Sequence, residues 1–585
     1  MIISRTLRRL AGKYLLFVAI FAAPVAYAEV ISAGNGDADP GTLLGNYLSG
    51  RVARGSHDTV AAADFYSKAL AGDPENELIL KQTFLLETAS AHWGRAIELA
   101  KVLVNVEPSD RVAQFLLGLD AFKRGDYKDA EKHFTAGRQG PIADLTSTLA
   151  RAWVQEAAGK HSEAIATLDS LSNADWAQYY QRYHRALIAD VAGRHQLARE
   201  AYTEAFKRNP TTLRVADAFA RHAINANDRE LAVATIKTHM AKAAPHPLSE
   251  ALLEQIENGE NPSLIVANAT AGLAEVFYGI GDALAGEGGL DMGIIFLQFA
   301  LYLEPDFTLA HIALAEAYEV AKKYDAQIAT FDRIPEDSPL WINIQIQKGF
   351  ALNALERVDE SQALLEALIA KNPDDIRPLD ALGNVLRAHE RYDEALKYYS
   401  RAVDLIDEPT KGNWALYYSR GVSNERLKDW PAAEADFEQA LELAPDESHI
   451  LNYLGYSWVD QGLNLDQAMD YIRKAVKLKP DDGYYVDSLG WAYYRLGNMP
   501  EAVEQLERAV ELRPDDPIIN DHLGDAYWRI GRKLEAKYQW EQSLTLKPED
   551  DLVVLLKEKI VSGLKEPAET KAADRTTHAD QKTSQ

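Results

Sequence analysis

Aromatic and arginine side chains recur at regular intervals in the C-terminal third of the chain, and their chemistry is that of protein binding. Tyr, Trp and Arg dominate the binding energy of protein interfaces, because each buries a large area and most also offer a polar group. We therefore predict a partner-binding surface made of Tyr418, Tyr453, Tyr456, Tyr484, Trp491, Tyr494, Arg495, Trp528 and Arg529. The competing interpretation is that these side chains pack between neighbouring helices and contact no ligand.

Carboxylates lie among these residues, at Asp487, Asp521 and Asp525. The chain as a whole is also acidic, with a formal net charge of −26 over 585 residues. This balance argues against nucleic acid and against an anionic membrane surface as the main partner. We expect the surface to bind extended protein segments that carry some positive charge, because complementary charge favours association.

The sequence gives little indication of catalysis. It contains no H-E-x-x-H zinc motif, no Walker-type phosphate loop, no G-x-S-x-G elbow and no calcium loop. It has no cysteine, so disulfides, thiolate metal sites and a cysteine nucleophile are excluded. A lone histidine such as His389 or His522 is expected to be a surface residue or a satisfied core residue. We predict that the protein is not an enzyme and uses no metal and no cofactor.

One sequence pattern occurs three times in succession between about residues 448 and 550. A Leu-Gly pair is followed by an aromatic residue, an alanine, a bulky apolar residue and a proline. The copies read Leu454-Gly455, Trp458, Ala468, Ile472, Pro480; Leu489-Gly490, Tyr493, Ala502, Leu506, Pro514; and Leu523-Gly524, Tyr527, Ala536, Trp540, Pro548. The closing prolines are 34 residues apart.

This spacing predicts a pair of helices in each copy. Positions 4, 7, 8 and 11 follow the i, i+3, i+4, i+7 rule and therefore share one face of a first helix. Gly490 and Ala502 are small where the two helices must cross. Glycines such as Gly497 are expected to end the first helix, and prolines such as Pro514 to stop the second. One pair cannot bury its apolar face alone, so an array is required.

The pattern resembles the tetratricopeptide repeat (TPR) family. This resemblance implies an all-α, right-handed superhelical solenoid of about fourteen helix–turn–helix repeats in two sub-arrays. It also implies that positions 2, 5, 9 and 12 of each copy, where most of the aromatic residues above lie, line a concave groove that binds peptides. We expect copies to begin near residues 43, 77, 111, 145, 179, 213, 274, 308, 342, 376, 414, 448, 483 and 517.

The segments around the repeats complete the predicted organisation. A glycine-rich stretch, 279–293, is expected to be a loose helix–helix connection. Acidic runs after the repeat prolines, such as Asp481-Asp482 and Asp515-Asp516, are expected to cap helix N-termini. The predicted divisions are a signal peptide at 1–28, a linker at 29–42, a degenerate N-terminal array at 43–246, a non-repeat insert at 247–273, a C-terminal array at 274–550, a capping helix at 551–564 and a disordered tail at 565–585.

The N-terminus predicts export. Arg5, Arg8, Arg9 and Lys13 precede an apolar run, and Ala26-Tyr27-Ala28 has the form of a signal-peptidase site. An uncleaved membrane anchor is the alternative. We expect a periplasmic protein with no transmembrane span after cleavage, and peripheral association with the outer membrane stays open.

Taken together, the sequence predicts a non-catalytic protein-interaction scaffold of the Gram-negative cell envelope. The chain looks similar to TPR adaptor proteins of carboxyl-terminal processing proteases. Those relatives are typically outer-membrane lipoproteins, whereas this chain lacks the cysteine that a lipid would modify. The alternative is a structural component of an envelope export or outer-membrane assembly machine, for polysaccharide or for protein. An adaptor would co-purify with a protease, and an export component with a membrane pore.

Overall fold

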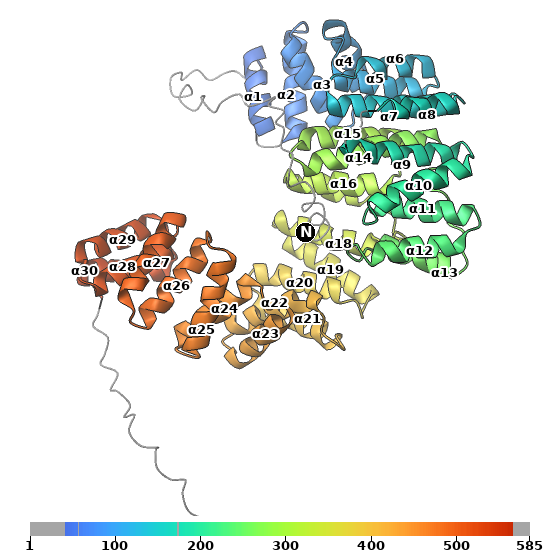
Figure 1. Ribbon diagram of the computed structural model, residues 1–585. Coiled ribbons are helices and arrows are strands. Elements are labelled where there is room, and N and C mark those ends of the chain that lie inside the picture. The colour runs from blue at the N-terminus through green and yellow to red at the C-terminus, as the bar shows by residue number, and fades with distance from the viewer. Residues whose placement is uncertain (1–40, 56–57, 172–174, 565–585) are drawn as a thin grey trace, which may run out of the picture. The chain divides into compact units, whose positions relative to one another are not determined.

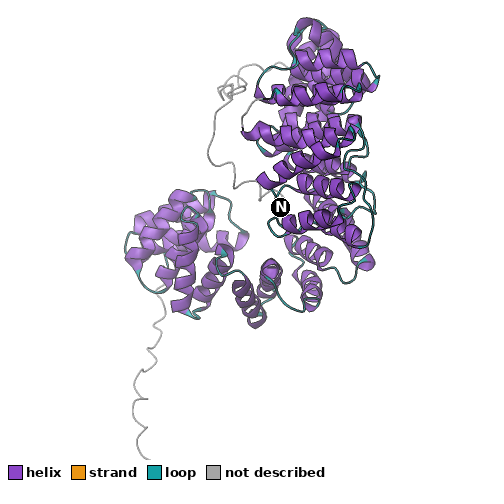
Figure 2. Ribbon diagram, turned by 45° about the vertical axis from the view of Figure 1, so that its right-hand side comes forward, coloured by secondary structure: helices purple, strands orange, loops and turns teal. Residues whose placement is uncertain are grey.

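The computed structural model describes residues 41–55, 58–171 and 175–564 (Figure 1). Over these residues it contains thirty α-helices, one short 3-10 helix and no strand (Figure 2), so the all-helical prediction is confirmed. Within the same residues, no helix combines the length and the apolar character that crossing a membrane requires. The predicted signal peptide, the tail at 565–585 and all but the last two residues of the linker lie outside the described residues.

The chain divides into two compact units, Met1–Leu368 and Ile369–Gln585, here called unit 1 and unit 2. Unit 1 is built mainly from consecutive helices joined by short turns: α1 (Leu43–Gly55), α2 (Thr59–Gly72), α3 (Glu77–Ala89), α4 (Trp93–Val106), α5 (Arg111–Lys123), α6 (Tyr127–Ala136), α7 (Pro141–Ala157), α8 (His161–Asp169), α9 (Asp175–Val191), α10 (His195–Arg208), α11 (Leu213–Asn225), α12 (Arg229–Met240), α13 (Pro247–Glu257), α14 (Ala269–Gly286), α15 (Leu290–Leu303), α16 (Thr308–Val320), α17 (Tyr324–Phe331), α18 (Trp341–Ala354) and α19 (Val358–Lys371), the last of which crosses the division.

Unit 2 continues the same alternation of first and second helices. Its elements are α20 (Ile376–Ala388), α21 (Tyr392–Asp404), η2 (Lys411–Asn413), α22 (Trp414–Arg426), α23 (Trp430–Leu443), α24 (Ser448–Gln461), α25 (Leu465–Leu478), α26 (Gly483–Arg495), α27 (Met499–Leu512), α28 (Pro517–Arg529), α29 (Lys533–Thr545) and α30 (Asp550–Ser562). The first helices α20, α22, α24, α26 and α28 begin at the residues that the period predicts.

Glycine at position 8 allows the two helices of a pair to touch. A Cβ added to Gly490 would lie 2.6 Å from Cγ of Leu506, and one added to Gly524 would overlap the ring of Trp540. Both partners are the bulky apolar residue of the second helix, and both are fully buried. The repeated Leu-Gly and bulky apolar positions are therefore two halves of one contact.

Helix ends in unit 2 follow the predicted local chemistry. Gly497 and Gly531 take φ values of 82° and 88°, the left-handed conformation that glycine adopts at little cost. The side chain of Asp482 accepts a hydrogen bond from the backbone of Tyr484, and Asp516 accepts from Ile518 in the same way. These caps satisfy backbone N–H groups that have no partner inside the helix.

The glycine-rich stretch is not a loose connection, contrary to the prediction. α14 runs through it as far as Gly286, and α15 begins at Leu290. A Cβ added to Gly293 would lie 2.6 Å from the backbone nitrogen of Ala285, and one added to Gly281 would lie 2.9 Å from the backbone nitrogen of Leu297. These glycines therefore let the two helices pack backbone to backbone.

The α14–α15 hairpin packs against helices from early in unit 1. The sequence suggested a division between sub-arrays at 247–273, whereas the compact units divide at Leu368. After α13 the chain returns, so that α14 lies on α7 and α9 while α15 lies on α3 and α5 (Figure 1). The helices that follow the segment 247–273 are therefore tied into unit 1.

Candidate functional site

First helices line the inner side of each array. In the described residues, successive first helices such as α24 and α26, or α26 and α28, contact each other more than successive second helices do. Helices that approach more closely lie on the inside of a curve. All nine predicted site residues belong to first helices of unit 2, and two of them, Arg495 and Arg529, are the last residues of their helices. We call the inner side of these first helices the unit 2 inner face.

The inner side of unit 1 is already filled by its own chain. The ring of Phe115 lies 6.2 Å from that of Phe277 on α14 and 6.0 Å from that of Phe296 on α15. Trp93 packs against Tyr302 at 4.6 Å, and a side chain at Gly272 would overlap the ring of Trp153. The α14–α15 hairpin thus occupies the place where a ligand of the first array would lie.

Polar contacts fix the hairpin in that place. Lys123 donates to the backbone oxygen of Tyr302 at 2.6 Å. Tyr183 on α9 donates to Glu275 on α14 at 3.0 Å, and Arg214 on α11 donates to the same carboxylate through Nε at 2.9 Å. Tyr183 and Arg214 both belong to first helices of the array, and Arg214 is charged. The hairpin is therefore held to the array by an ion pair as well as by packing.

The centre of the predicted site is a stack of three rings on α26 and α28. The ring of Trp491 lies 4.7 Å from that of Tyr494 and 4.0 Å from that of His522, nearly parallel to both. His522 is buried, and its Nδ1 lies 3.0 Å from both carboxylate oxygens of Asp487. Trp491 and Tyr494 keep part of their surface exposed. The binding surface predicted from the sequence included Trp491 and Tyr494 but did not include His522.

The charge of His522 is set by its neighbours. Burial alone would lower the pKa of this imidazole, but the carboxylate of Asp487, with Asp521 and Asp525, outweighs burial and raises it above its usual value. Burial, with Asp521 adding, raises the pKa of Asp525 to about 6. A protonated His522 stacked on Trp491 would be stabilised by the negative face of the indole ring.

Two further predicted residues lie near acidic groups, Arg495 by direct hydrogen bonds and Tyr456 through the electrostatic influence of Asp487 and Asp460. Arg495 donates to a carboxylate oxygen of Asp460 at 3.0 Å and to its backbone oxygen at 2.9 Å. Tyr456 is half-buried, and burial, with Asp487 and Asp460 adding, raises the pKa of its phenol to about 12. The phenol therefore stays protonated and can donate a hydrogen bond.

Tyr418 and Tyr453 pack together further along the unit 2 inner face. Their rings lie 5.9 Å apart, and that of Tyr453 lies 5.2 Å from Phe437 on a second helix. Tyr453 also donates to Glu425 at 3.1 Å, and burial raises the pKa of its phenol. This pair therefore joins two repeats and also presents part of its surface.

Trp528 and Arg529 lie at the C-terminal end of the face. Arg529 donates to the hydroxyl of Tyr494 at 3.2 Å, which links it to the stack. Trp528 packs at 5.3 Å from Trp540, and Gly563, just after α30, lies so close that a side chain there would overlap its ring. The packing interpretation therefore fits Trp528 better than the binding interpretation does.

Tyr484 is the most exposed of the predicted aromatic residues. Arg513, the residue just after α27, donates to its hydroxyl at 2.8 Å, and the guanidinium lies 4.7 Å from the ring centre. This pair stands at the rim of the unit 2 inner face, at the start of α26.

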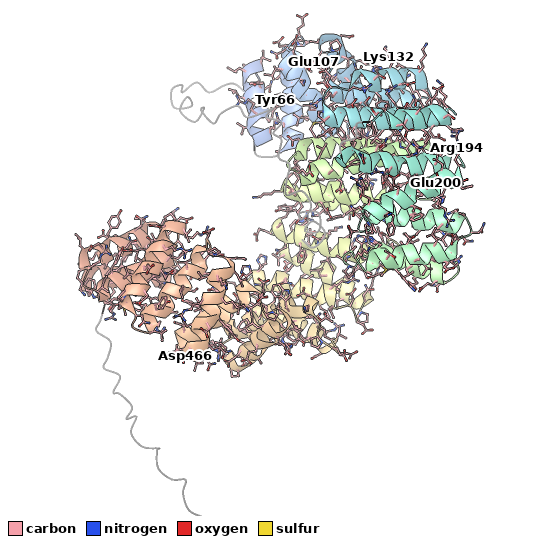
Figure 3. The ribbon with its side chains drawn as sticks, viewed as in Figure 1. Tyr66, Glu107, Lys132, Arg194, Glu200 and Asp466 are labelled. Atoms are coloured by element: carbon pink, nitrogen blue, oxygen red, sulfur yellow. The ribbon has the colours of Figure 1, made fainter. Side chains whose placement is uncertain are left out.

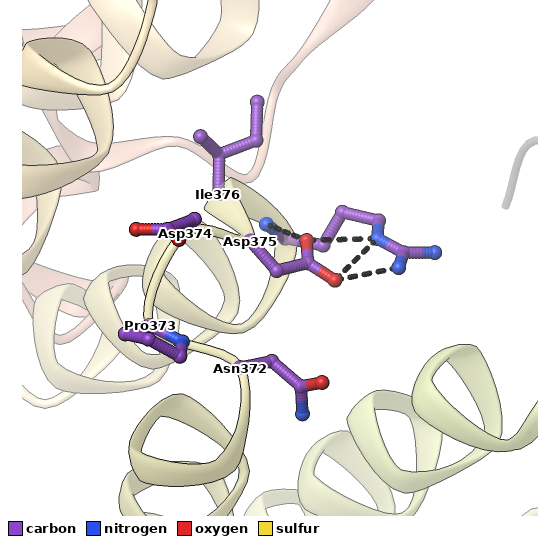
Figure 4. A pocket seen from close by; sticks show the side chains of 6 residues that line it. Asn372, Pro373, Asp374, Asp375 and Ile376 are labelled. Atoms are coloured by element: carbon purple, nitrogen blue, oxygen red, sulfur yellow. Dashed lines mark hydrogen bonds and ion pairs between the residues drawn. The ribbon is translucent and has the colours of Figure 1, made fainter.

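Two shallow hollows lie elsewhere on the described surface. Within the described residues no group of acidic or histidine side chains could hold a metal ion. The hollow at residues 372–377 is an open turn, where Asp375 accepts from the backbone and the Nε of Arg377 at 3.0 and 2.9 Å (Figure 4). Another small hollow lies at residues 194–200, and charged side chains such as Arg194 and Glu200 are exposed there (Figure 3).

Comparisons with known proteins agree on the repeat. A family model described as TPR repeat matches residues 490–531, and one described as tetratricopeptide repeat matches 115–178, 351–413 and 418–483. A TPR repeat-containing protein of Pseudomonas aeruginosa is 30% identical over 163 residues, which are 26% of this chain and 26% of that protein. Tetratricopeptide repeat protein 13 of Homo sapiens is 26% identical over 203 residues, 34% of this chain and 23% of that protein. The chain thus spans about a quarter of the length of these relatives.

Among solved structures, the APC/C hetero-tetramer Cut9-Hcn1 has a TM-score of 0.38 at 12% identity, covering 90% of this chain and 97% of that chain. YrrB, described as a TPR protein with an unusual peptide-binding site, has a TM-score of 0.27 at 22% identity, covering 33% of this chain and 97% of that chain. The family matches, with the paired helices and the contacts between their motif positions, show that the matched segments are tetratricopeptide repeats within a solenoid that is all-helical over the described residues.

Proposed function

We propose that the protein is a non-catalytic scaffold that holds a segment of a partner protein on the unit 2 inner face. The observation that carries this proposal is the stack of Trp491, Tyr494 and His522. It presents partly exposed aromatic surface, while its His522 is paired with the carboxylate of Asp487 and the adjacent Arg495 with that of Asp460. Rigid aromatic rings beside paired charges are typical of interface hot spots, because they need little ordering on binding.

Binding belongs to unit 2 in this proposal because its inner face is lined by partly exposed aromatic residues, whereas that of unit 1 holds the α14–α15 hairpin. The buried ring contacts of that hairpin, such as Phe115 with Phe277, would all have to be lost before a ligand could enter. Such a loss would cost far more than a single peptide segment returns.

The expected segment carries lysine or arginine together with an apolar side chain. Basic groups would be attracted by the acidic character of the chain and by Asp460 and Asp487. The apolar side chain would cover the exposed edge of Trp491. Asp487 is already paired with His522 and Asp460 with Arg495, so both would contribute through their field more than through a direct bond.

We further propose a periplasmic location, based on the signal-like sequence at 1–28, and a role as adaptor of a processing protease. A structural role in an envelope export or outer-membrane assembly machine, for polysaccharide or for protein, is the second candidate. It rests on the same export signal and repeat array.

Crosslinking in the native envelope followed by purification of the tagged chain tests the proposal. We expect the captured partner to fall about 30-fold in Trp491→Ala, since a hot spot contributes about 2 kcal/mol or more. Tyr538→Ala, which removes an exposed aromatic residue from α29, should capture as much as the native chain. A captured protease whose cleavage is accelerated would identify an adaptor, and a captured membrane pore would identify an export component. A folded Trp491→Ala protein that retains its partners would overturn the proposed face.

A further inference from the structure

Three first helices of unit 2 carry an aspartate at the same position, the fifth: Asp380 on α20, Asp487 on α26 and Asp521 on α28. Two of these carboxylates bind a basic side chain from a later helix. Nδ1 of His522 on α28 lies 3.0 Å from both carboxylate oxygens of Asp487. Nζ of Lys559 on α30 lies 2.7 Å from both carboxylate oxygens of Asp521. The fold itself therefore shows that a carboxylate at this position binds a basic group.

Asp380 has no such partner. The two basic residues of α22, Arg420 and Arg426, pair with Asp436 and Glu425 instead. Among the described residues, no basic group lies within ion-pair distance of the carboxylate of Asp380. The place that His522 and Lys559 occupy in the later repeats is thus not occupied by the chain's own basic groups here.

The neighbours of Asp380 fix the direction of its carboxylate. Nδ2 of Asn384 donates to Oδ1 of Asp380 at 3.1 Å, and Tyr399 donates to Oδ1 of Asn384 at 3.1 Å, which holds the amide in this orientation. Arg387 donates to the hydroxyl of Tyr399 and to Oδ1 of Asn384, both at 3.3 Å, rather than to Asp380. Oδ2 of Asp380 is therefore left without a hydrogen-bond partner among the described residues.

The carboxylate of Asp380 is also costly to keep charged. The residue is half-buried, and burial raises the pKa of its carboxyl to about 6, although the hydrogen bond from Asn384 and the charge of Arg387 act in the opposite direction. A nearby positive charge favours the ionised form of such a group. A basic ligand would therefore supply what the surroundings of Asp380 lack.

We propose that the carboxylate of Asp380 binds the ammonium group of a lysine in the partner segment. This inference rests on the proposed function, since it places one residue of that segment on the unit 2 inner face. Lysine fits better than arginine because Asn384 already holds Oδ1. The oxygen that remains suits a compact ammonium group, whereas a guanidinium pairs best with both oxygens of a carboxylate. Tyr418, at the fifth position of α22, is partly exposed and can pack on the aliphatic part of the lysine.

The repeat also sets the spacing between this lysine and the aromatic stack. Trp491 lies on α26, which is the third first helix after α20. Packed helices lie about 10 Å apart, so the path from Asp380 to Trp491 along the face is about 30 Å or less. An extended chain advances about 3.3 Å per residue. The partner's lysine and the apolar residue that covers Trp491 are therefore separated by about nine residues or fewer.

Carbodiimide coupling in the native envelope tests the contact, because this reagent joins a carboxylate directly to an amine that touches it. The tagged full chain is purified after coupling, and the joined peptides are identified by mass spectrometry. We expect an amide bond between Asp380 and a lysine of the captured partner, with an apolar residue within about nine positions of that lysine. A captured partner whose couplings never include Asp380 would overturn the lysine site.

The variant Asp380→Asn tests the charge. It keeps the volume and the contact with Asn384, and capture of the partner should fall at least about tenfold, because a hydrogen bond between charged groups is lost. The midpoint of thermal unfolding should stay the same or rise, since the native carboxylate has no cation. Glu438→Gln makes the same change at an exposed carboxylate on α23 and should leave capture unchanged. A lower midpoint for Asp380→Asn would show that the carboxylate stabilises the fold and would contradict the proposal.

Trp491→Ala separates this site from the proposed function. If Trp491→Ala lowers capture and Asp380→Asn does not, the unit 2 inner face binds a partner but Asp380 does not hold its lysine. If neither variant lowers capture, the proposed function fails together with the lysine site.

Discussion

Glu275 provides a sharp test of how the α14–α15 hairpin is held in unit 1. The residue is 3% exposed and lies on α14. It accepts hydrogen bonds from Tyr183 on α9 at 3.0 Å and from the Nε of Arg214 on α11 at 2.9 Å. Burial alone would lower the pKa of Arg214, but the carboxylate of Glu275 outweighs burial and raises it well above its usual value. The guanidinium thus stays charged, and removing Glu275 would leave that charge buried.

The expected cost follows from this geometry. Glu275→Ala should lower the free energy of unfolding of unit 1 by about 3–5 kcal/mol, the usual cost of breaking a buried ion pair. The ring of Tyr278, whose centre lies 5.9 Å from the guanidinium, would still stabilise the charge of Arg214 and so reduce this cost. The double variant Arg214→Met, Glu275→Leu removes both charges and keeps the volume, so it should cost about 2 kcal/mol or less. The two positions should therefore be strongly non-additive.

Urea unfolding can measure these differences, with tryptophan fluorescence reporting on unit 1 through Trp153, which packs against Gly272 of α14. Glu163→Ala is the control, since Glu163 forms an exposed pair with Lys160 and should cost about 1 kcal/mol or less. If Glu275→Ala costs no more than Glu163→Ala, the charged link is not what holds the hairpin. If the double variant costs the sum of the single variants, the ion-pair reasoning is wrong.

Three predictions concern unit 2. Gly490→Ala should lower its free energy of unfolding by about 1–3 kcal/mol, measured by thermal melting, because the added methyl group meets Leu506. Trp528→Ala should lower the free energy of unfolding of unit 2 by about 3 kcal/mol and increase hydrogen exchange in α30. If the variant instead loses partner capture without losing stability, Trp528 is a binding residue. His522 should keep its proton above pH 6.5 in an NMR titration, and Asp487→Asn should lower that midpoint. Since the folded pKa is raised, the stabilisation by Asp487 is fully present below pH 6.5 and is lost as the pH rises through the pKa of His522.

The helices and their pairing could be predicted because their causes lie within one repeat. The glycine and the bulky apolar residue of a pair, such as Gly490 and Leu506, contact each other. Caps such as Asp516 act on the next turn of the chain. Each of these signals joins residues fewer than about twenty places apart, so a sequence pattern can contain both partners.

The candidate site was only half predictable. The period places Trp491 and Tyr494 on the inner side of a first helix, and the structure stacks them there. His522 completes the stack from the next repeat, and it carries no signal of its own as a lone histidine. Trp528 occupies the same repeat position as Tyr494, but α30 follows it, so equivalent positions meet different neighbours. The repeat period predicts where a residue lies on its helix, but it does not predict which neighbouring helix packs against that residue.

The amino-acid sequence by itself determined the repeat, the helix ends and the face on which the aromatic residues lie, because these depend on local spacing and backbone chemistry. Only the tertiary structure decided that α14 and α15 return to fill the inner side of unit 1. The sequence does indicate that α15 is buried, since the residues from Ile294 to Ala300 are apolar on almost every side of the helix. In the structure all of them are buried. That signal shows that α15 must be covered on all sides but not by which helices, because contacts with α3 and α5 join residues some two hundred places apart, as Gln298 and Ala89 show.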